Sequence, residues 1–464
     1  MKKQTFALFF GNRGFFPGEV IAEARSKLVD ACVKNGYGYL IMDEHLTRYG
    51  AVETIAEGKL YADFLEANKG KYDGVILSLP NFGDENGASV ALRDVSVPIL
   101  VHAFPDELDK MDFAHRRDSM CGKMAMCNIL RQMDISYTLT DKFCTDPASD
   151  SFAADLDRFA AICRVYRGMK QFNIGAIGAR TTAFKTVRFD EIALQRKRIN
   201  IETIDMTMVF AMMDGVDGEK LAAKKARYSS IASFEGYPEE KLESIARLGV
   251  VIDELISTYD LQAIALRCWD ELEKTYGIAP CLILGELNER GIAASCELDI
   301  SNAIMMRAIY LATAHPVVLL DVNNNYGDED DKAIFFHCGP APASFIKGKG
   351  EIQEHLMFKK TYGEGSGVGI NKGECISCEV TVGSLKTENG DICAFVTDGK
   401  LTDDKLPEEF FGFGTVFERK NSGKLFNYMA SNGYRHHVAV SKGNYVCAIE
   451  EAFGKYLGYK IDRI

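Results

Sequence analysis

Strand-like and helix-like segments alternate regularly over much of this 464-residue chain. Apolar runs of strand length occupy residues 4–10, 37–42, 74–80 and 97–102, and the segments 19–35 and 51–68 between them have apolar positions at helical spacing. A second series starts at residue 172 and continues to an apolar run at 263–267. Strands that alternate with helices predict doubly wound parallel sheets. We therefore expect two Rossmann-like or flavodoxin-like α/β domains, residues 1–170 and 171–315.

The pattern changes after residue 321. Short alternating runs at 333–337, 375–382, 392–397, 414–418 and 437–440 are separated by Gly, Asn and Asp residues. This texture is typical of an antiparallel sheet or a small β-barrel. It predicts a C-terminal β-rich domain, residues 316–464, that ends in a helix over 445–457. A glycine-rich stretch at 363–369 has no following helix, so we interpret it as a hairpin or flap rather than a phosphate-binding loop.

Charge and cysteine usage exclude several functions. A net charge of -12 and an isoelectric point near 5.3 argue against a nucleic-acid partner, which requires a basic face. No apolar run reaches the roughly 18 residues of a membrane span. The 13 scattered cysteines fit a reducing compartment, so we expect a cytoplasmic protein. The one CxxC motif, Cys375 to Cys378, lacks the second pair of a zinc site and is interpreted as two strand residues.

Two acidic residues stand beside apolar segments in the middle of the chain. Glu297 follows a nearly uncharged stretch and precedes a helical run at 300–314, and Asp321 ends the apolar run 316–321. We expect both at the carboxyl edge of a parallel sheet, where loops carry reactive side chains. Glu297 could instead cap its helix, although Asp299 is better placed for that, and Asp321 could be a turn residue. Together with the late histidines, the two acids indicate one divalent metal site.

Six further side chains are candidate ligands or substrate contacts. His436 and His437 would point to opposite faces of a strand, so only one of them should bind the metal directly. His337 is either a core histidine, a sugar contact or an extra ligand. The remaining candidates are the single tryptophan, which can stack on a sugar, and two arginines that can bind hydroxyls or an anionic group: Trp269, Arg13 and Arg267.

These segments resemble the L-fucose isomerase and L-arabinose isomerase family of aldose–ketose isomerases. The resemblance covers most of the chain, and its most specific part is the Glu297 to Asp321 spacing followed by a C-terminal histidine. The segments that carry it are Ala294-Ser-Cys-Glu297-Leu-Asp299, Asp321, His337-Cys-Gly339, His437-Val-Ala-Val-Ser-Lys-Gly443, Arg267-Cys-Trp269 and Arg117-Asp-Ser-Met-Cys-Gly122.

The resemblance implies a divalent cation, usually Mn²⁺ but alternatively Mg²⁺ or Co²⁺, held by Glu297, Asp321 and His437. It implies proton transfer between C1 and C2 of an open-chain aldose through a cis-enediol, with the two carboxylates as ligands and acid/base groups. A hydride shift would use the same ligands. His436 stands where the fucose enzyme has asparagine, so the resemblance does not identify the substrate. The candidate sugars are L-fucose, L-arabinose and an anionic hexose such as sulfoquinovose, which Arg13, Arg267 and Lys442 could bind.

The family also implies a homo-oligomer, a hexamer or trimer, with active sites at subunit interfaces. In such an assembly the first domain covers a neighbour's site, so that Arg13 could reach the sugar of an adjacent subunit. Two other functions are compatible with paired α/β domains. A sugar-binding receptor or regulatory module would bind its ligand without a metal, and an NAD-linked oxidoreductase is disfavoured because the GxGxxG fingerprint is missing.

Overall fold

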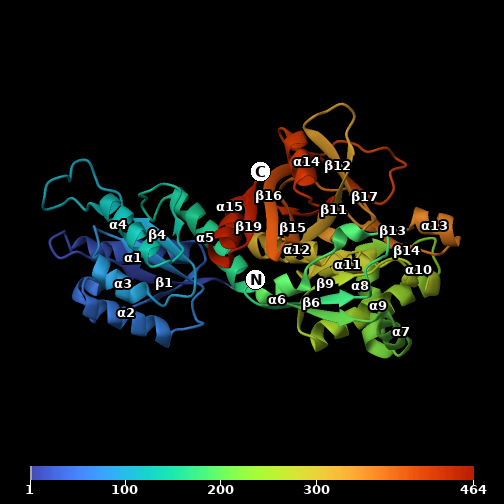
Figure 1. The fold of residues 1–464 in the computed structure, drawn as a ribbon, viewed down its shortest axis with the longest axis horizontal. Coiled ribbons are helices and arrows are strands. Elements are labelled where there is room, and N and C mark those ends of the chain that lie inside the picture. Colours follow the sequence, from blue (N-terminus) through green and yellow to red (C-terminus); the bar gives the residue numbers. More distant parts are fainter. Residues whose placement is uncertain (1–2) are drawn as a thin grey trace. The chain divides into compact units, whose positions relative to one another are not determined.

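The structure is a computed structural model that describes residues 3–464 (Figure 1). The chain forms two compact units. The first runs up to Arg167 and also includes Cys447–Gly458, and the second comprises Gly168–Val446 and Tyr459–Ile464. The fold is mixed α/β, with parallel sheets in the N-terminal part and a mostly antiparallel sheet in the C-terminal part. The boundaries of the three predicted domains stay a prediction.

The first unit is built on one parallel sheet with the order β2-β1-β3-β4-β5. Its strands are β1 (Thr5–Phe10), β2 (Gly38–Ile41), β3 (Gly74–Leu79), β4 (Ile99–Ala103) and β5 (Thr138–Leu139). Its helices are α1 (Val20–Lys34), α2 (Ile55–Ala67), α3 (Glu85–Leu92), α4 (Ser119–Gln132), α5 (Asp150–Met169) and the late helix α15 (Val446–Glu451), which continues as a π-helix over Ala452–Leu457. A short 3-10 turn spans Arg48–Gly50.

Both faces of this sheet are buried, as the sequence predicted for a doubly wound unit. Along β1, Phe6, Leu8 and Phe10 pack into one hydrophobic cluster. The alternate residues Ala7 and Phe9 pack into another. A strand covered on both sides is almost continuously apolar, which explains the run of hydrophobic residues in β1.

The second unit contains another parallel sheet with the order β10-β9-β6-β7. Its strands are β6 (Phe172–Ile177), β7 (Ile199–Ile204), β9 (Leu261–Leu266) and β10 (Ala293–Cys296). The helices of this part are α6 (Glu191–Arg196), α7 (Met206–Asp214), α8 (Gly218–Ile231), α9 (Glu239–Thr258), α10 (Glu271–Thr275), α11 (Cys281–Glu289) and α12 (Ile300–Thr313), with a 3-10 turn at Lys185–Val187. The carboxyl ends of β10, β9 and β6 therefore lie next to one another in that order.

The C-terminal strands of the second unit pair in a ring, β15-β18-β11-β12-β17-β16 and back to β15, with β19 added beside β16. These strands are β11 (Val317–Asn325), β12 (Lys332–His337), β15 (Cys378–Glu388), β16 (Asp391–Leu401), β17 (Phe413–Glu418), β18 (His437–Lys442) and β19 (Lys460–Arg463). A smaller sheet contains β8 (Ala232–Ser233), β13 (Gly350–Glu354) and β14 (Val368–Lys372). This part of the chain also contains two helices, α13 (Leu356–Tyr362) and α14 (Ser422–Ser431), and a 3-10 turn at Ala343–Phe345.

The structure corrects the expected position of Asp321. It does not end a strand at the edge of a parallel sheet, because β11 continues to Asn325 and pairs antiparallel with β12 and β18. The three asparagines at 323–325 favour a turn by composition. They remain in the strand, with a register shift between Val322 and Asn324.

Two other features of the described residues bear on the sequence predictions. The glycine-rich stretch 363–369 follows α13 and leads into β14, so a helix stands between the two strands β13 and β14. In the described part of the chain, none of the helices has both the length and the apolar character required to cross a bilayer.

Candidate active site

Glu297 follows the carboxyl end of β10 in a tight, left-handed turn. Glu297 and Leu298 have φ angles of 59° and 61°, which non-glycine residues adopt uncommonly. Asp299 then caps α12 by accepting a hydrogen bond from the backbone N–H of Asn302. The prediction that Asp299 and not Glu297 caps the helix is confirmed. Glu297 therefore does not cap α12, and only 8% of the residue is exposed.

Asp321 and His437 are direct partners across β11 and β18. Side chains of such a pair project on the same face of the sheet, which brings a carboxylate and an imidazole together. His337 ends β12, the strand on the other side of β11, one position beyond the partner of Asp321. Two neighbouring strand pairings thus bring His337 and His437 to the two sides of Asp321, although Asp321 and His437 are more than 100 positions apart in sequence.

His437 links two overlapping groups of candidate metal ligands, Glu297 with His337 and His437, and Asp321 with His436 and His437; among the described residues neither group contains both carboxylates. Nε2 of His437 lies 3.0 Å from Oε2 of Glu297 and 3.3 Å from Oδ1 of Asp321. Nε2 of His337 is also buried close by, since ligand atoms of Glu297, His337 and His437 lie within 4.8 Å of one another. None of these four buried atoms makes a well-formed hydrogen bond within residues 3–464. Buried polar atoms without a well-formed hydrogen bond are costly, and their grouping around His437 is compatible with a bound cation.

Asp299 fixes the orientation of His437. The Asp299 carboxylate is completely buried and accepts a hydrogen bond from Nδ1 of His437 at 2.8 Å. Its other partners are the side-chain amide of Asn302, at 2.7 Å, and the buried guanidinium of Arg435. Because Nδ1 donates to Asp299, the lone pair of Nε2 in neutral His437 faces Glu297 and Asp321. This is the usual arrangement of a metal-binding histidine.

The same network shifts several pKa values. Burial would raise the pKa of Asp299, but the positive charge of Arg435 and the hydrogen bond from His437 hold it well below its usual range. Burial also opposes ionisation of Glu297, yet contact with His437 gives this carboxyl a net lowered pKa. Conversely, Asp299 and Glu297 outweigh the burial of His437 and raise its pKa well above the ordinary value. Without a cation, the cluster is held together by charge.

His337 and His436 differ from His437. Nδ1 of His337 accepts a hydrogen bond from the backbone N–H of Cys338 at 2.9 Å. A ring nitrogen that accepts an N–H carries no proton, so neutral His337 has its proton on Nε2 and is a donor there. His436 is partly exposed, and its Nε2 lies 3.8 Å from Oδ1 of Asp321. Burial, followed by repulsion from protonated His437, lowers the pKa of His436.

One aromatic side chain that packs against this cluster has no signal in the sequence. The ring of Phe184 lies 5.6 Å from the rings of both His436 and His437 and 5.9 Å from Trp269. Phe184 therefore packs against both Trp269 and the two histidines. Arg267 lies beyond the end of β9, and its guanidinium is 2.8 Å from the Glu271 carboxylate.

The other predicted cations lie elsewhere. Arg13 belongs to the first unit, where it pairs with Glu85 at 3.2 Å and lies 4.0 Å over the ring of Phe82. Lys442 is at the end of β18 opposite His437, and its ammonium donates to the backbone carbonyl of Ser344. Four residues of extended strand lie between Lys442 and His437, and the expected contact of Lys442 with the anionic group of a sugar stays a prediction.

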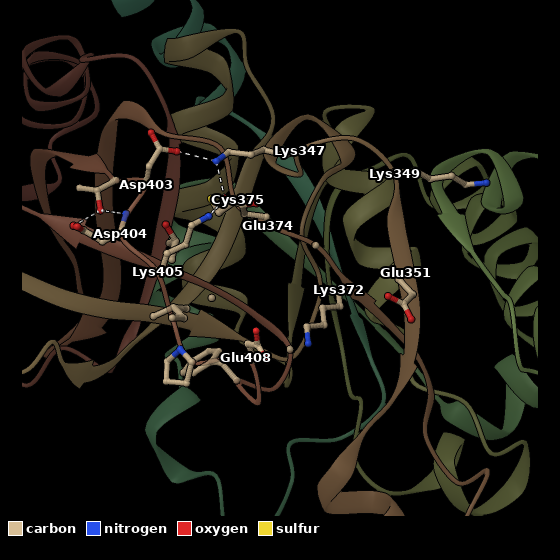
Figure 2. Close-up of a pocket in the computed structure, with 18 residues that line it drawn as sticks. Lys347, Lys349, Glu351, Lys372, Glu374, Cys375, Asp403, Asp404, Lys405 and Glu408 are labelled. Atoms are coloured by element: carbon tan, nitrogen blue, oxygen red, sulfur yellow. Dashed lines mark hydrogen bonds and ion pairs between the residues drawn. The ribbon is translucent and has the colours of Figure 1, made fainter.

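A separate cavity of about 400 Å³ lies in the C-terminal part of the second unit and contains none of the cluster residues. Figure 2 shows Lys347 between Asp403 and Glu374, and Lys405 beside Glu374. Four of its charged side chains, Lys347, Lys405, Glu374 and Asp403, are paired with each other. This cavity is therefore a different site from the carboxylate–histidine cluster.

The end of a parallel α/β sheet and an antiparallel ring of strands together present carboxylates and histidines in two groups that could hold a metal ion. Residues 7–170 match the family model described as the N-terminal domain of fucose/sulfoquinovose isomerase, and residues 335–464 match the C-terminal domain of L-fucose isomerase. The chain belongs to the fucose/sulfoquinovose isomerase family, whose members are aldose–ketose isomerases.

Relatives named sulfoquinovose isomerase match most of the chain. A sulfoquinovose isomerase of Priestia aryabhattai is 22% identical over 384 residues, which cover 82% of this chain and 83% of the relative. Sulfoquinovose isomerases of Clostridium sp. (strain MSTE9) and Alkalicoccus urumqiensis are also 22% identical, over 337 and 315 residues. The first match covers 71% of this chain and 72% of the relative, and the second covers 67% and 69%.

Proposed function

We propose that this protein is a metal-dependent aldose–ketose isomerase that acts on an acidic hexose of the sulfoquinovose type. The observation that carries the proposal is the convergence of Glu297 Oε2, Asp321 Oδ1 and His437 Nε2, all buried and none hydrogen-bonded within the described residues. The names of the relatives support the choice of sugar.

A hard divalent cation fits this donor set. Two carboxylates and one neutral imidazole suit Mn²⁺, and Mg²⁺ or Co²⁺ are alternatives. Glu297, Asp321 and His437 would hold the ion, and Asp299 would keep His437 in the required tautomer. When bound, the ion supplies a Lewis acid that stabilises negative charge on the sugar oxygens.

The side chains perform the proton transfers. In the proposed direction, one carboxylate of Glu297 or Asp321 removes the proton from C2 of the open-chain aldose, which gives a cis-enediol. The proton returns to C1, and the proton of the C2 hydroxyl is transferred to the oxygen on C1, so the 2-ketose forms without any net loss of atoms. Each carboxylate has two oxygens, so a ligand can also accept a proton.

His337 complements the two acids as a hydrogen-bond donor. Its protonated Nε2 is buried, makes no hydrogen bond within residues 3–464, and belongs to the same group of atoms as Glu297 and His437. We assign it to a sugar oxygen rather than to the metal, because a ligand nitrogen must offer a lone pair. His436 and Trp269 are proposed substrate contacts at the more open side of the cluster. The homo-oligomer, a hexamer or trimer, and the cytoplasmic location remain predictions.

The test is isomerisation by the purified protein after removal of metal with a chelator. We expect no ketose from sulfoquinovose without metal and recovery of turnover on addition of Mn²⁺, followed by NMR of the product. In D₂O, an enediol mechanism incorporates deuterium at C1 of the ketose, whereas a hydride shift retains the original hydrogen. The proposed function is wrong if no acidic or neutral aldose is converted with any of the three metal ions.

A further inference from the structure

The loop that follows β6 is rich in positive charge. Residues 178–188 contain Arg180, Lys185 and Arg188, and within residues 3–464 none of these three cations lies within 4.0 Å of a carboxylate. Nη1 of Arg180 donates to the carbonyl oxygens of Thr181 and Thr182, at 2.9 and 3.2 Å. The guanidinium is thus anchored by its own loop while its charge remains uncompensated.

The loop also holds a buried hydroxyl without a partner. Oγ1 of Thr181 is shielded from solvent and makes no hydrogen bond within the described chain. A hydroxyl next to an uncompensated guanidinium provides two kinds of donor for an anion.

Phe184 attaches this loop to the carboxylate–histidine cluster. It lies four residues after Arg180 and packs against His436, His437 and Trp269. At its start, the loop is joined to the sheet because the backbone N–H of Gly178 donates to Ile204 at 2.8 Å. The loop therefore has one end on the sheet and its aromatic residue on the site.

The strand order sets the separation between the loop and the acids. Glu297 follows β10, Arg267 follows β9, and the loop follows β6, and these strands are consecutive neighbours. Adjacent strands are about 4.8 Å apart, so the ends of β10 and β6 are about 10 Å apart. An extended six-carbon sugar with a sulfonate on C6 reaches about 8 Å from C1 to the sulfonate oxygens, for carbon–carbon bonds near 1.5 Å. A substrate with its reacting carbons at Glu297 would place its acidic end beside the loop.

The other cations of this region are already neutralised or too distant. Arg267 pairs with Glu271, and Arg435 pairs with Asp299 in the buried network. Lys442 is at the opposite end of β18. Arg180 is the cation that combines an anchored guanidinium, an uncompensated charge and a position on the loop that contacts the site.

We propose that residues 178–188 form the subsite for the anionic end of the substrate and that Arg180 determines the preference for an acidic over a neutral aldose. The assignment rests on the proposed function, and it specifies the substrate class at that site. A guanidinium binds a sulfonate through two parallel N–H donors, which a neutral sugar cannot use.

The test compares a sulfonated sugar with the same sugar lacking the sulfonate. Sulfoquinovose and 6-deoxyglucose are assayed with the Mn²⁺-loaded wild type, Arg180→Gln and Arg180→Lys. The exposed Arg196 of α6 supplies the matched control, Arg196→Gln. We expect Arg180→Gln to lower kcat/KM for sulfoquinovose by about 10–100-fold, mainly through KM, because a charged hydrogen bond is lost. The value for 6-deoxyglucose should change by less than about 3-fold, and Arg180→Lys should restore part of the loss because it retains the charge.

Binding of an unreactive analogue separates this proposal from the proposed function. The sugar alcohols of the two compounds are titrated calorimetrically into the same proteins. The subsite is supported if the wild type prefers the sulfonated alcohol and Arg180→Gln abolishes that preference, even if neither aldose is converted. It is overturned if the wild type shows no preference, if Arg180→Gln weakens both alcohols equally, or if Arg196→Gln has the same effect.

Discussion

Asp299 offers the sharpest test of how the cluster is held together. The change Asp299→Asn keeps the size of the side chain and an oxygen that can still cap α12, but it removes the negative charge between His437 and Arg435. The Arg435 side chain is only 4% exposed, so its guanidinium would remain buried without a counter-ion. Removal of one partner of a buried pair costs about 3–5 kcal/mol, and we expect a loss near the lower end because the amide still accepts one hydrogen bond.

The same substitution should weaken metal binding. An amide oxygen is a poorer acceptor than a carboxylate for the Nδ1 proton of His437, so the ring is less firmly oriented and its Nε2 is less basic. Loss of such a partner typically lowers metal affinity by about 10–100-fold. Mn²⁺ affinity is measured by the loss of the free-ion electron paramagnetic resonance signal, and stability by urea unfolding of the metal-free protein.

The control is Asp391→Asn, which removes an exposed partner of Lys460 in the same unit. That pair should contribute no more than about 1 kcal/mol and should not affect Mn²⁺. Equal loss of stability in the two variants would refute the account of the buried network. Unchanged Mn²⁺ affinity in Asp299→Asn, despite a loss of stability, would refute its role in orienting His437.

Three further predictions test the catalytic acid, the pH dependence and the core. Glu297→Gln should lower kcat by about 100–10,000-fold, because it removes a proposed acid/base group, and it should also destabilise the metal-free protein, because His437 loses a buried charged partner; full activity would exclude Glu297 from the chemistry. Burial raises the pKa of Glu273 from 4.5 to about 8, so the folded protein binds this proton more tightly than the unfolded chain. Its contribution to stability is complete below about pH 4.5 and is lost as the pH rises to about 8. Between pH 6 and pH 9 this amounts to about 2–3 kcal/mol, which Glu273→Gln should remove from urea unfolding curves at these two pH values; an identical pH dependence in the variant would contradict the shift. Phe335 is fully buried and stacks on Phe417 at 4.3 Å, so Phe335→Ala should lower the free energy of unfolding by about 3–5 kcal/mol, and a loss below 1 kcal/mol would show that the ring is not part of a rigid core.

The parallel sheets could be predicted because their strands are apolar on both faces and their helices are amphipathic. Helix α11, Cys281–Glu289, was not, since eight of its nine residues are buried and no polar face marks the helical period. Strand β10 is only four residues long, too short for a pattern to emerge. The three asparagines at 323–325 have the composition of a turn, so the sequence predicts a strand end at Asp321. Pairing with β12 and β18 instead keeps these residues in β11.

The candidate site was predictable only in part for a similar reason. Its carboxylates and histidines are chemically conspicuous residues, and the family resemblance selects them. Phe184, Arg435 and the orienting role of Asp299 have no such signal, because each contact joins segments more than 100 residues apart and depends on tertiary packing. Side chains that orient the reactive groups are therefore harder to find from sequence than the reactive groups themselves.

The position of Asp299 explains how two sheets of different type can build one site. Glu297 belongs to the parallel sheet, whereas Asp321 and His437 belong to the antiparallel ring. Asp299 is two residues from Glu297, caps α12, and binds His437 of the ring, and Asn302 of α12 also donates to the backbone carbonyl of His437 at 3.3 Å. Any shift of α12 relative to β18 would separate Glu297 from His437 and break these buried hydrogen bonds at the same time. The energetic cost of that shift keeps Glu297 close to Asp321 and His437 of the antiparallel ring.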